Sequence, residues 1–531
     1  MDSFNNDSCN TLSTQWSNTS FVASNPWLAD YNDESCSPAS PDSPCTTAGY
    51  PAYIITAAEV ADVQAGLDFA RTHNIRLVVK GTGHDFPGRS SGAGSLSIYT
   101  HNLRGMEVNM SDQTAMRYGG IAAVKIAAGM RFREIYTEAA KHNITVVGGA
   151  DPGVGIGGWI LNGGHSPISS LYGLGADQIL SLEVVTSDGQ HRIVNETSFP
   201  DLFWALRGGG GSTFAVMLSV TVKAYPQLRG AINSYSFATT ADSETFWSML
   251  TYFHSEIPRI SEAGGMGYHY LVRGVTIGIP EVDMLTGGWF FPQKTVEQMN
   301  VVLNPILATI NASSLGPDTI HVSSNDSVFE AAMYLLARSS GETAGISGRL
   351  GSWLLTGPAL TNNFEELKKG LRTATPQPWN LISHVVGGPG VRNAVAHLPG
   401  GSNAVLPAWR IAYTHVVLPR AWPTDPSNTT LKQSVTSALR DVTVPALKSL
   451  APVSGAFINE ADPTNPDWKH DYFGSNYERL LKIKHTYDPR DVFWCKPCVG
   501  WDEWEIVDGP DNLPMAEWGV GQSSGRLCRK V

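Results

Sequence analysis

The chain has 531 residues, of which 42% are hydrophobic and 16% charged, so it is long enough for two domains with sizeable cores. Its formal net charge is -11, and it has no block of Lys or Arg and no run of about 20 apolar residues. We therefore expect neither a nucleic-acid partner nor a membrane partner.

The cysteines lie only near the two ends of the chain, at Cys9, Cys36, Cys45, Cys495, Cys498 and Cys528. Catalytic or metal-binding thiols would be expected beside other chemical motifs, so this distribution favours disulfides that tie down the termini, with Cys36 and Cys45 as natural partners. The pair Cys495-Lys-Pro-Cys498 could also be a redox dithiol, but no thioredoxin-like pattern surrounds it.

Acceptor motifs for N-glycans begin at Asn6, Asn18, Asn109, Asn143, Asn195, Asn311, Asn325 and Asn428. Together with the cysteine pattern they indicate passage through a secretory pathway. The first residues lack the charged and apolar regions of a signal peptide, so we expect that a signal has been removed and that the protein is secreted.

Residues 1–50 are polar and are interpreted as an N-terminal arm. After it, the run Thr56-Ala-Ala-Glu59 is interpreted as a capping box that opens a helix. The pattern then predicts strands at 76–79 and 124–128, a helix at 131–142, a strand at 144–147, and a hairpin turn at Asp188-Gly189 between strands at 180–186 and 191–194.

The segment 227–464 has fewer glycine-rich stretches and mixes helical stretches such as 364–372 with strand-like runs such as 411–418. It is interpreted as a second domain. The chain then returns to a helical pattern at 476–484, which ends at Asp488-Pro489.

The first glycine-rich stretch, Val79-Lys-Gly-Thr-Gly-His-Asp-Phe-Pro-Gly-Arg-Ser-Ser91, directly follows a predicted strand. Such a loop exposes several backbone N–H groups, which suits a pyrophosphate, and it places His84 in the middle of the cradle. A surface turn with a solvated histidine explains the same residues.

The second stretch runs from Gly148 to Gly158 and continues to Asp177. Its glycines fit the dinucleotide-binding fingerprint, with Asp177 where a ribose-binding acid is expected. We interpret this match as a false positive, because Asp-Pro precedes it and the glycines at 163 and 164 would disrupt the helix that the fingerprint should open.

Two further stretches occupy 201–214 and 471–480. In order and spacing, the four together resemble the vanillyl-alcohol-oxidase flavoproteins, within them the berberine-bridge-enzyme-like branch. The resemblance covers about 50–226 and 465–495. It implies an α+β, two-domain FAD-binding fold, with an FAD domain formed by 51–226 and 465–500, an inserted sheet-plus-helices substrate domain at 227–464, and a C-terminal tail at 501–531.

The resemblance also implies that FAD is bonded through its 8α-methyl group to His84. The cysteine that forms a second covalent link in many relatives falls on Asp151, so that link cannot form here, and the carboxylate either faces the flavin or only caps its own loop. The other residues expected at the cofactor are Lys80, Gly81, Thr82, Gly83, Asp85, Gly88, Ser90, Gly153, Val154, Gly155, Gly157, Gly158, Gly163, Gly164, Val194 and Asn476.

Val154 aligns with the family position at which a small residue is associated with oxygen reaching the flavin. This favours an oxidase that passes electrons to O2 and releases H2O2.

Catalysis requires a base that takes a proton while a hydride passes to flavin N5. Tyr472 falls on the family tyrosine that serves as this base in several relatives; the alternative is a tyrosine packed under the helix at Asn476. His415 lies on the strand after Pro407-Ala-Trp-Arg410, where relatives place a residue that faces the substrate; a plain core or surface histidine is the alternative. Arg410 supplies a positive charge nearby or a simple salt bridge.

The resulting hypothesis is a secreted oxidase of a small alcohol, because 407–410 and 493–501 resemble fungal secreted isoamyl alcohol oxidase-like proteins. Sugars, polyols and phenolic or secondary metabolites remain alternative substrates. The rival functions are a flavin dehydrogenase with another acceptor and a flavin-bearing binding protein without turnover. No metal site is predicted, and the chain has neither Gly-x-Ser-x-Gly nor His-Glu-x-x-His, which disfavours a hydrolase.

Overall fold

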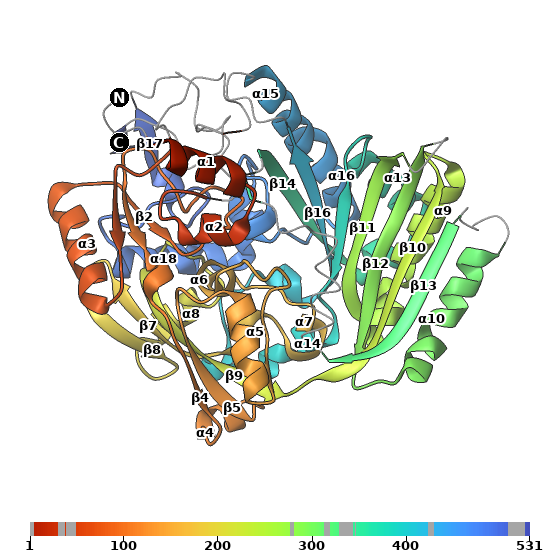
Figure 1. Ribbon diagram of the computed structural model, residues 1–531, viewed down its shortest axis with the longest axis horizontal. Coiled ribbons are helices and arrows are strands. Elements are labelled where there is room, and N and C mark those ends of the chain that lie inside the picture. The colour runs from red at the N-terminus through yellow and green to blue at the C-terminus, as the bar shows by residue number, and fades with distance from the viewer. Residues whose placement is uncertain are drawn as a thin grey trace.

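The computed structural model of the protein describes residues 5–29, 38, 49–276, 281–312, 319–328, 344, 345, 347–422, 429–507 and 526–530. Two parts, each built around β-sheets, lie side by side (Figure 1). None of the described helices is both long enough and apolar enough to cross a lipid bilayer.

The first part contains a three-stranded parallel sheet in the order β1-β3-β2. Its strands are β1 (Tyr53–Thr56), β2 (Leu77–Lys80) and β3 (Leu96–Tyr99), and α3 (Val60–His73) links β1 to β2. Val63 and Leu67 on the inner face of α3 are fully buried, as the apolar spacing of the sequence requires.

The start of α3 differs from the predicted capping box at Thr56. Thr56 is the last residue of β1, and Glu59 is the N-cap of the helix. The cause is Asp62, whose carboxylate accepts hydrogen bonds from the backbone N–H groups of Ala58 and Glu59 and so satisfies donors that a helix start leaves free.

A six-stranded antiparallel sheet forms the rest of the first part, in the order β4-β5-β9-β7-β8 with β6 also paired to β9. Its strands are β4 (Met106–Asn109), β5 (Ala122–Ala127), β6 (Ile144–Val146), β7 (Ile179–Thr186), β8 (His191–Asn195) and β9 (Ala215–Pro226). The helices of this region include α5 (Phe132–Lys141) and α8 (Pro200–Leu206). The predicted helix at 131–142, the strands around it and the hairpin at Asp188-Gly189 are confirmed, with ends that shift by one or two residues.

The C-terminal segment returns to this first part. It contains α17 (Trp468–Phe473) and α18 (Tyr477–Tyr487), and α18 packs against α8. The Tyr487 hydroxyl donates to Asp201 over 2.8 Å, and the Ser187 hydroxyl donates to the Tyr487 carbonyl over 2.6 Å. Segments from both ends of the chain therefore share one unit.

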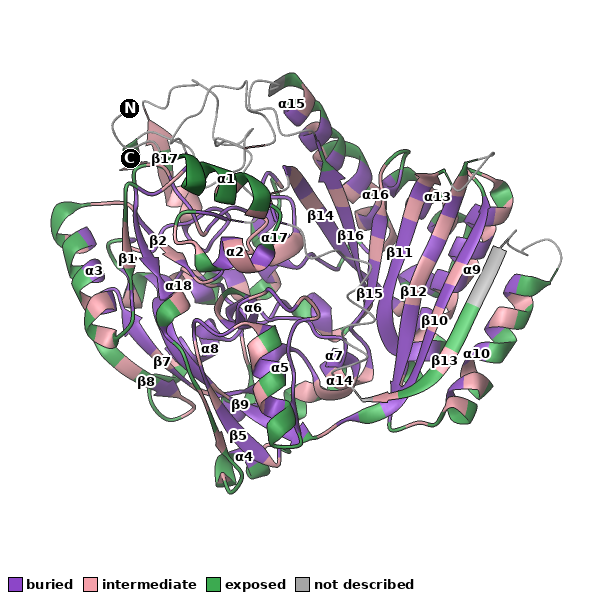
Figure 2. Ribbon diagram, in the orientation of Figure 1, coloured by how far each residue is buried: buried purple, intermediate pink, exposed green. Residues whose placement is uncertain are grey.

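The second part is a seven-stranded sheet in the order β13-β10-β12-β11-β15-β16-β14. Its strands are β10 (Arg229–Thr240), β11 (Met266–Val275), β12 (Val282–Pro292), β13 (Thr319–Val328), β14 (Gly348–Thr356), β15 (Leu381–Val385) and β16 (Ala412–Ala421). The helices α9 (Glu244–Glu262), α10 (Val296–Asn311) and α13 (Phe364–Ala374) pack on one another and on the sheet. Figure 2 shows that most of the strands between α3 and α10 are buried, and that these two helices expose their outer faces.

The register of β11, β15 and β16 aligns three side chains that matter for the site. Tyr268 pairs with His384, and His384 pairs with His415. Because successive side chains of a strand point to opposite faces, these three share one face, whereas His269 points to the other, with its ring centroid 5.0 Å from that of Phe253 on α9.

The N-terminal arm contains two helices that the sequence did not predict, α1 (Asn6–Gln15) and α2 (Thr19–Ser24). After α2 the chain passes over the first glycine-rich loop, where the Asn25 carbonyl accepts a hydrogen bond of 2.6 Å from the Lys80 ammonium group. A Cβ atom on Gly83 would lie 3.1 Å from Ala29 Cα, so the arm lies directly against this loop.

The cysteines only partly follow the expectation. Cys495 and Cys498 form a disulfide, which joins near neighbours and does not tie a terminus to a distant segment. Cys9 and Cys528 are free thiols. The predicted Cys36–Cys45 pair lies outside the described residues.

Candidate active site

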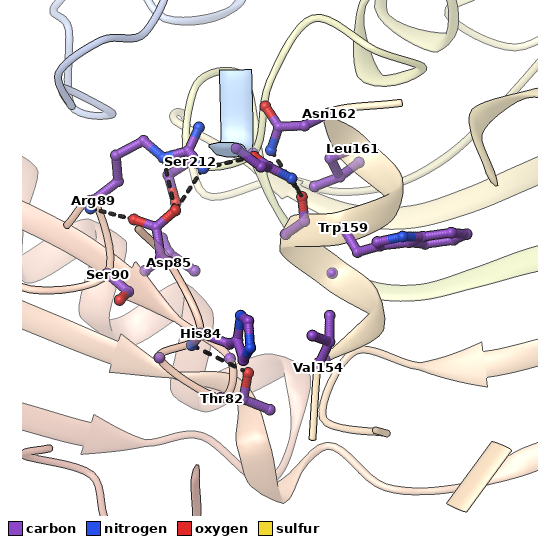
Figure 3. Close-up of a pocket in the computed structure, with 18 of the residues that line it drawn as sticks. Thr82, His84, Asp85, Arg89, Ser90, Val154, Trp159, Leu161, Asn162 and Ser212 are labelled. Carbon is purple, nitrogen blue, oxygen red and sulfur yellow. Dashed lines mark hydrogen bonds and ion pairs between the residues drawn. The ribbon is translucent and has the colours of Figure 1, made fainter. Parts of the chain in front are cut away.

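The first three of the four glycine-rich stretches line a cavity in the first part (Figure 3). The stretch at 471–480 does not reach it. The loop after β2, the start of α6 (Ile156–Leu161) and the loop before β9 form its walls, and the segment 457–460 closes it. The second stretch does open a helix, but one that ends before Gly163. Predicted cofactor residues on this cavity are Gly81, Thr82, Gly83, His84, Asp85, Ser90, Val154, Gly155, Gly157 and Gly158.

Asp85 organises the first loop. Its carboxylate accepts hydrogen bonds from the backbone and the guanidinium group of Arg89, including one of 3.0 Å from Nε. The Arg89 guanidinium also donates to Asn459 over 2.7 Å. Arg89 therefore joins the N-terminal loop to the C-terminal segment on the cavity wall.

The cavity carries polar atoms that suit a bound cofactor. Arg89 Nη1, Ser90 Oγ and Asn162 Oδ1 are buried and have no hydrogen-bond partner among the described residues, and all three residues line the cavity. A Cβ atom on Gly158 would meet no atom within 4 Å. Because buried polar groups in proteins are normally paired, these atoms fit a ligand with its own donors and acceptors, as the phosphates and ring of FAD provide.

His84 faces Asp151. Its Nε2 atom lies 3.6 Å from a carboxylate oxygen of Asp151, whose other oxygen accepts a hydrogen bond of 2.7 Å from the Gly153 backbone N–H. Burial by itself would raise the pKa of Asp151, but the His84 imidazole and the Gly153 amide outweigh burial and hold this pKa below its usual value. Asp151 thus caps its own loop, as one of the two alternatives expected, and it also faces His84.

A second cavity, of about 310 Å³, lies between the first part and the seven-stranded sheet. It shares five lining residues with the first cavity, namely His84, Phe86, Val154, Trp159 and Glu460. From the sheet come Tyr268, Tyr270, Ile382, His384 and Val417. The two cavities therefore meet at His84 and Glu460, with aromatic and apolar side chains beyond.

Glu460 lies at the centre of a group of histidines. Both of its carboxylate oxygens are 3.3 Å from His165 Nε2, and one is 3.3 Å from His415 Nδ1. The Tyr268 hydroxyl lies 3.4 Å from His165 Nδ1. The pKa of Glu460 lies well below its usual value, because the nearby imidazoles of His165, His415 and His384 outweigh the opposing effect of burial. Burial lowers the pKa of His415 to about 3.

Tyr472, the predicted base, lies away from both cavities. It is almost fully buried, its hydroxyl donates to the backbone carbonyl of Asp462, and it lines neither cavity. Burial raises the pKa of its hydroxyl well above the usual value. The packed-tyrosine alternative describes this residue.

The other two predicted catalytic residues divide. Arg410 forms a bidentate ion pair with Asp177, with both N–O distances 2.8 Å, and lines neither cavity, so its salt-bridge alternative describes it. His415 is fully buried, as a core histidine would be, yet it contacts Glu460 and so lies directly behind the cavity.

Several predicted cofactor residues do not line the first cavity: Lys80, Gly88, Gly153, Gly163, Gly164, Val194 and Asn476. Lys80 is held by Asn25 and lies 4.9 Å over the Tyr99 ring. Asn476 donates to the carbonyl groups of 404 and 405, and Val194 is fully buried in the core. A Cβ atom on Gly164 would approach the Trp159 ring to 2.6 Å, so this glycine permits close packing.

Glu460, His165 and His384 line the second cavity but were not among the site residues predicted from the sequence. Glu460 precedes the predicted start of the C-terminal FAD segment at 465, and His165 directly follows the glycines of the second stretch. Asn459-Glu460, next to a motif, was a usable signal. His384 had none, because only strand pairing brings it to the site.

Comparison with known proteins agrees with this geometry. A sequence model described as "FAD binding domain" matches residues 51–195, and one described as "Berberine and berberine like" matches residues 456–500. The second match includes Glu460.

Relatives cover nearly the whole chain. The FAD-linked oxidoreductase patO of Aspergillus clavatus is 32% identical over 538 residues, covering 99% of this chain and 87% of that protein. The VAO-type flavoprotein oxidase VAO615 of Thermothelomyces thermophilus is 31% identical, covering 94% of this chain and 82% of that protein. The solved structure of the VAO-type flavoprotein MtVAO713 from Myceliophthora thermophila C1 matches with a TM-score of 0.87 at 27% identity, covering 99% of this chain and 92% of that one. The predicted two-domain fold class is thereby confirmed.

Proposed function

Because the chain belongs to the vanillyl-alcohol-oxidase-type FAD oxidoreductases, in their berberine-bridge-enzyme-like branch, we propose that it oxidises a small alcohol-type substrate, with FAD bonded to His84 and O2 as electron acceptor. One observation carries this proposal: the first cavity, whose walls carry the glycine-rich loops, and the second cavity meet at His84 and Glu460.

The first cavity supplies the groups that would hold FAD. Backbone of the loop at 81–85 and of 155–158 surrounds it, and Arg89, Ser90 and Asn162 direct unpaired polar atoms to it. When bound, FAD accepts a hydride from the substrate at N5 and passes two electrons to O2, which gives H2O2. The protein supplies position and proton transfer.

Glu460 is the proposed proton acceptor. It borders both cavities, and its ionised carboxylate can take the hydroxyl proton of an alcohol as the hydride leaves. His165, 3.3 Å away, orients the carboxylate, and Tyr268 in turn orients His165.

The second cavity supports a small, partly apolar substrate. Tyr270, Ile382 and Val417 give it apolar walls, and its volume of about 310 Å³ lies near the lower end of small-molecule sites. Val154 lies where the two cavities meet, and its small side chain leaves room for O2 beside the reacting atoms.

A secreted glycoprotein is also part of the proposal. Of the expected N-glycan acceptors, Asn6, Asn18, Asn109, Asn143, Asn311 and Asn325 are exposed. A mobility shift after treatment of the secreted protein with a peptide N-glycosidase tests this assignment.

The main test is an anaerobic absorbance screen of the purified flavoprotein against alcohols, sugars, polyols and phenols. Bleaching by an alcohol, followed by recovery of the flavin spectrum and release of H2O2 in air, is the expected result. Bleaching without recovery in air indicates a dehydrogenase, and the absence of bleaching by every class indicates a binding protein.

The covalent attachment is tested with His84→Ala. We expect this variant to release its flavin on acid precipitation, whereas the wild type and a His397→Ala control, altered at an exposed histidine, keep it. Flavin that stays attached to His84→Ala contradicts the assignment.

A further inference from the structure

Four side chains from distant segments meet at the inner end of the second cavity. They are His165, which follows α6, His384 on β15, His415 on β16 and Glu460. One ligand atom from each lies within 4.8 Å of every other, and these four residues are called the His–Glu cluster below. The row of paired strands holds His384 beside His415, so the cluster is built into the sheet.

The cluster contains polar atoms without partners. Among the described residues, His384 Nδ1 and both ring nitrogens of His415 are buried without a hydrogen bond, and these two side chains are only 8% and 0% exposed. His415 Nδ1 lies 3.3 Å from Glu460, but its alignment is too poor for a hydrogen bond. Unpaired buried nitrogen atoms are costly, because each has lost its hydrogen bonds to water without gaining a partner.

The charges of the cluster also call for a cation. His384 and His415 are buried, and the ring nitrogens that have no hydrogen bond among the described residues can present lone pairs to an ion. The Glu460 carboxylate carries a negative charge. Among the described residues, no Lys or Arg forms an ion pair with Glu460, and the nearest nitrogen atoms recorded there belong to the rings of His165 and His415.

We propose that the His–Glu cluster binds one divalent transition-metal ion of the zinc class. Neutral imidazole nitrogens and a carboxylate oxygen are the donors such ions prefer, at about 2.0–2.2 Å. A tetrahedral ion with these bonds separates its donors by about 3.3–3.6 Å. The carboxylate of Glu460 is already 3.3 Å from His165 and from His415, and all four ligand atoms lie within 4.8 Å of one another, so small side-chain shifts suffice to close the site around an ion.

The surroundings of the cluster suit this role. The Tyr268 hydroxyl lies at Nδ1 of His165, which leaves Nε2 directed at Glu460, and such outer partners orient metal-binding imidazoles. His165, His384 and Glu460 line the second cavity, so an ion has a path to the cluster. Binding of the ion requires no turnover and is measured without substrate, although the cluster shares Glu460 and His165 with the proposed oxidation.

The test is calorimetric titration of the chelator-treated, dialysed flavoprotein with ZnCl2 in the absence of substrate. We expect one site per chain. His384→Ala should weaken its affinity by at least about tenfold, since even outer partners of metal ligands contribute about 10–100-fold. His397→Ala, at an exposed histidine outside the cluster, should bind as the wild type does.

A second readout identifies the ligands. Cu²⁺ added at one equivalent should give an electron paramagnetic resonance spectrum with nitrogen hyperfine structure, which His384→Ala simplifies. If His384→Ala fails to fold, as judged by flavin content and melting temperature, His165→Gln replaces it. Absence of one-site binding, or unchanged Zn²⁺ affinity in the folded variant, would mean that the cluster holds only protons or water and would overturn the proposal. Because no substrate is present, this outcome is independent of whether an alcohol is oxidised.

Discussion

His84 and Asp151 face each other across the junction of the two cavities, with Nε2 of the histidine 3.6 Å from a carboxylate oxygen of the aspartate. We expect that oxygen to stabilise a hydrogen on Nε2, in which case Nδ1 is the nitrogen that would bond to carbon in the proposed attachment. A charged residue in place of a second cysteine thus prepares His84 for the single attachment proposed above.

Asp151→Asn tests this role. The amide keeps the shape of the side chain but removes its charge, so we expect a smaller fraction of covalently bound flavin after expression. The measurement is flavin fluorescence of the protein band on a denaturing gel, compared with total flavin in the native protein. An unchanged covalent fraction would show that Asp151 only caps its loop.

Glu460→Gln should retain FAD and lose turnover. Removal of a positioned base lowers rates by about 10²–10⁴-fold, and we expect this loss in the anaerobic rate of flavin reduction by a substrate found in the screen. Glu107→Gln, at an exposed position on β4, is the matched control. A reduction rate within a few-fold of the wild type would exclude Glu460 as the base.

Tyr472→Phe distinguishes a structural role of this tyrosine from the role of catalytic base that the sequence predicts. Its hydroxyl donates to the Asp462 carbonyl, so its removal should lower the free energy of unfolding by about 0.5–1.5 kcal/mol. Denaturant unfolding measures this change. The rate of flavin reduction should stay near that of the wild type, and a loss as large as that of Glu460→Gln would restore Tyr472 as the base.

Arg410→Met should destabilise the protein through Asp177. The variant leaves a fully buried carboxylate without its partner, which typically costs about 3–5 kcal/mol. Burial would raise the pKa of Asp177, but Arg410, the Leu174 backbone N–H and the Asn403 side chain outweigh it and lower this pKa. In the wild type its contribution is therefore present above the unfolded pKa of about 3.9 and is lost as the pH falls through the lower folded value.

The stability of the Arg410→Met variant should depend on pH in the opposite direction to the contribution described for the wild type. Without Arg410 the carboxylate favours protonation, so the stability difference between wild type and variant should shrink as the pH falls toward 4. Melting temperatures at pH 7 and pH 4.5 measure it. A difference that grows on acidification would contradict this account.

Zinc should inhibit turnover, because an ion in the His–Glu cluster occupies the carboxylate that accepts the proton. Stopped-flow reduction of the flavin with and without one equivalent of ZnCl2 measures the effect, and chelation should restore the rate. His384→Ala should show a weaker response at the same Zn²⁺ concentration. Equal inhibition of both proteins would place the inhibitory ion elsewhere.

Local features were predicted well from the sequence. The apolar spacing of α3 and α5, the turn at Asp188-Gly189 and the loop around His84 depend on residues close together in the chain, so their patterns are readable directly. The predicted start of α3 was wrong. Asp62 accepts a hydrogen bond from the backbone N–H of Glu59, the N-cap of the helix, whereas Thr56 is still part of β1.

The substrate side was not readable in the same way. Tyr268, His384 and His415 meet only because β11, β15 and β16 pair in one particular register, and a single sequence does not contain that register. Tyr472 matched a family pattern by its position along the chain, whereas its hydroxyl turned to a backbone carbonyl. Glu460 lay just outside the segment that the motifs delimited.

The paired strands that carry His384 repeat their arrangement two residues away, where Tyr270, Ile382 and Val417 form a second row across the same strands and also line the second cavity. In the proposed mechanism the row with His384 lies beside the proton-transfer groups, and we expect its neighbour to shape the space in which the substrate would bind. Mutations in the second row can therefore change which molecule fits while the proton-transfer groups and the flavin loop stay intact. Tyr270, Ile382 and Val417 are therefore a small set of positions at which mutation, in nature or in the laboratory, can change the substrate while the rest of the site is kept.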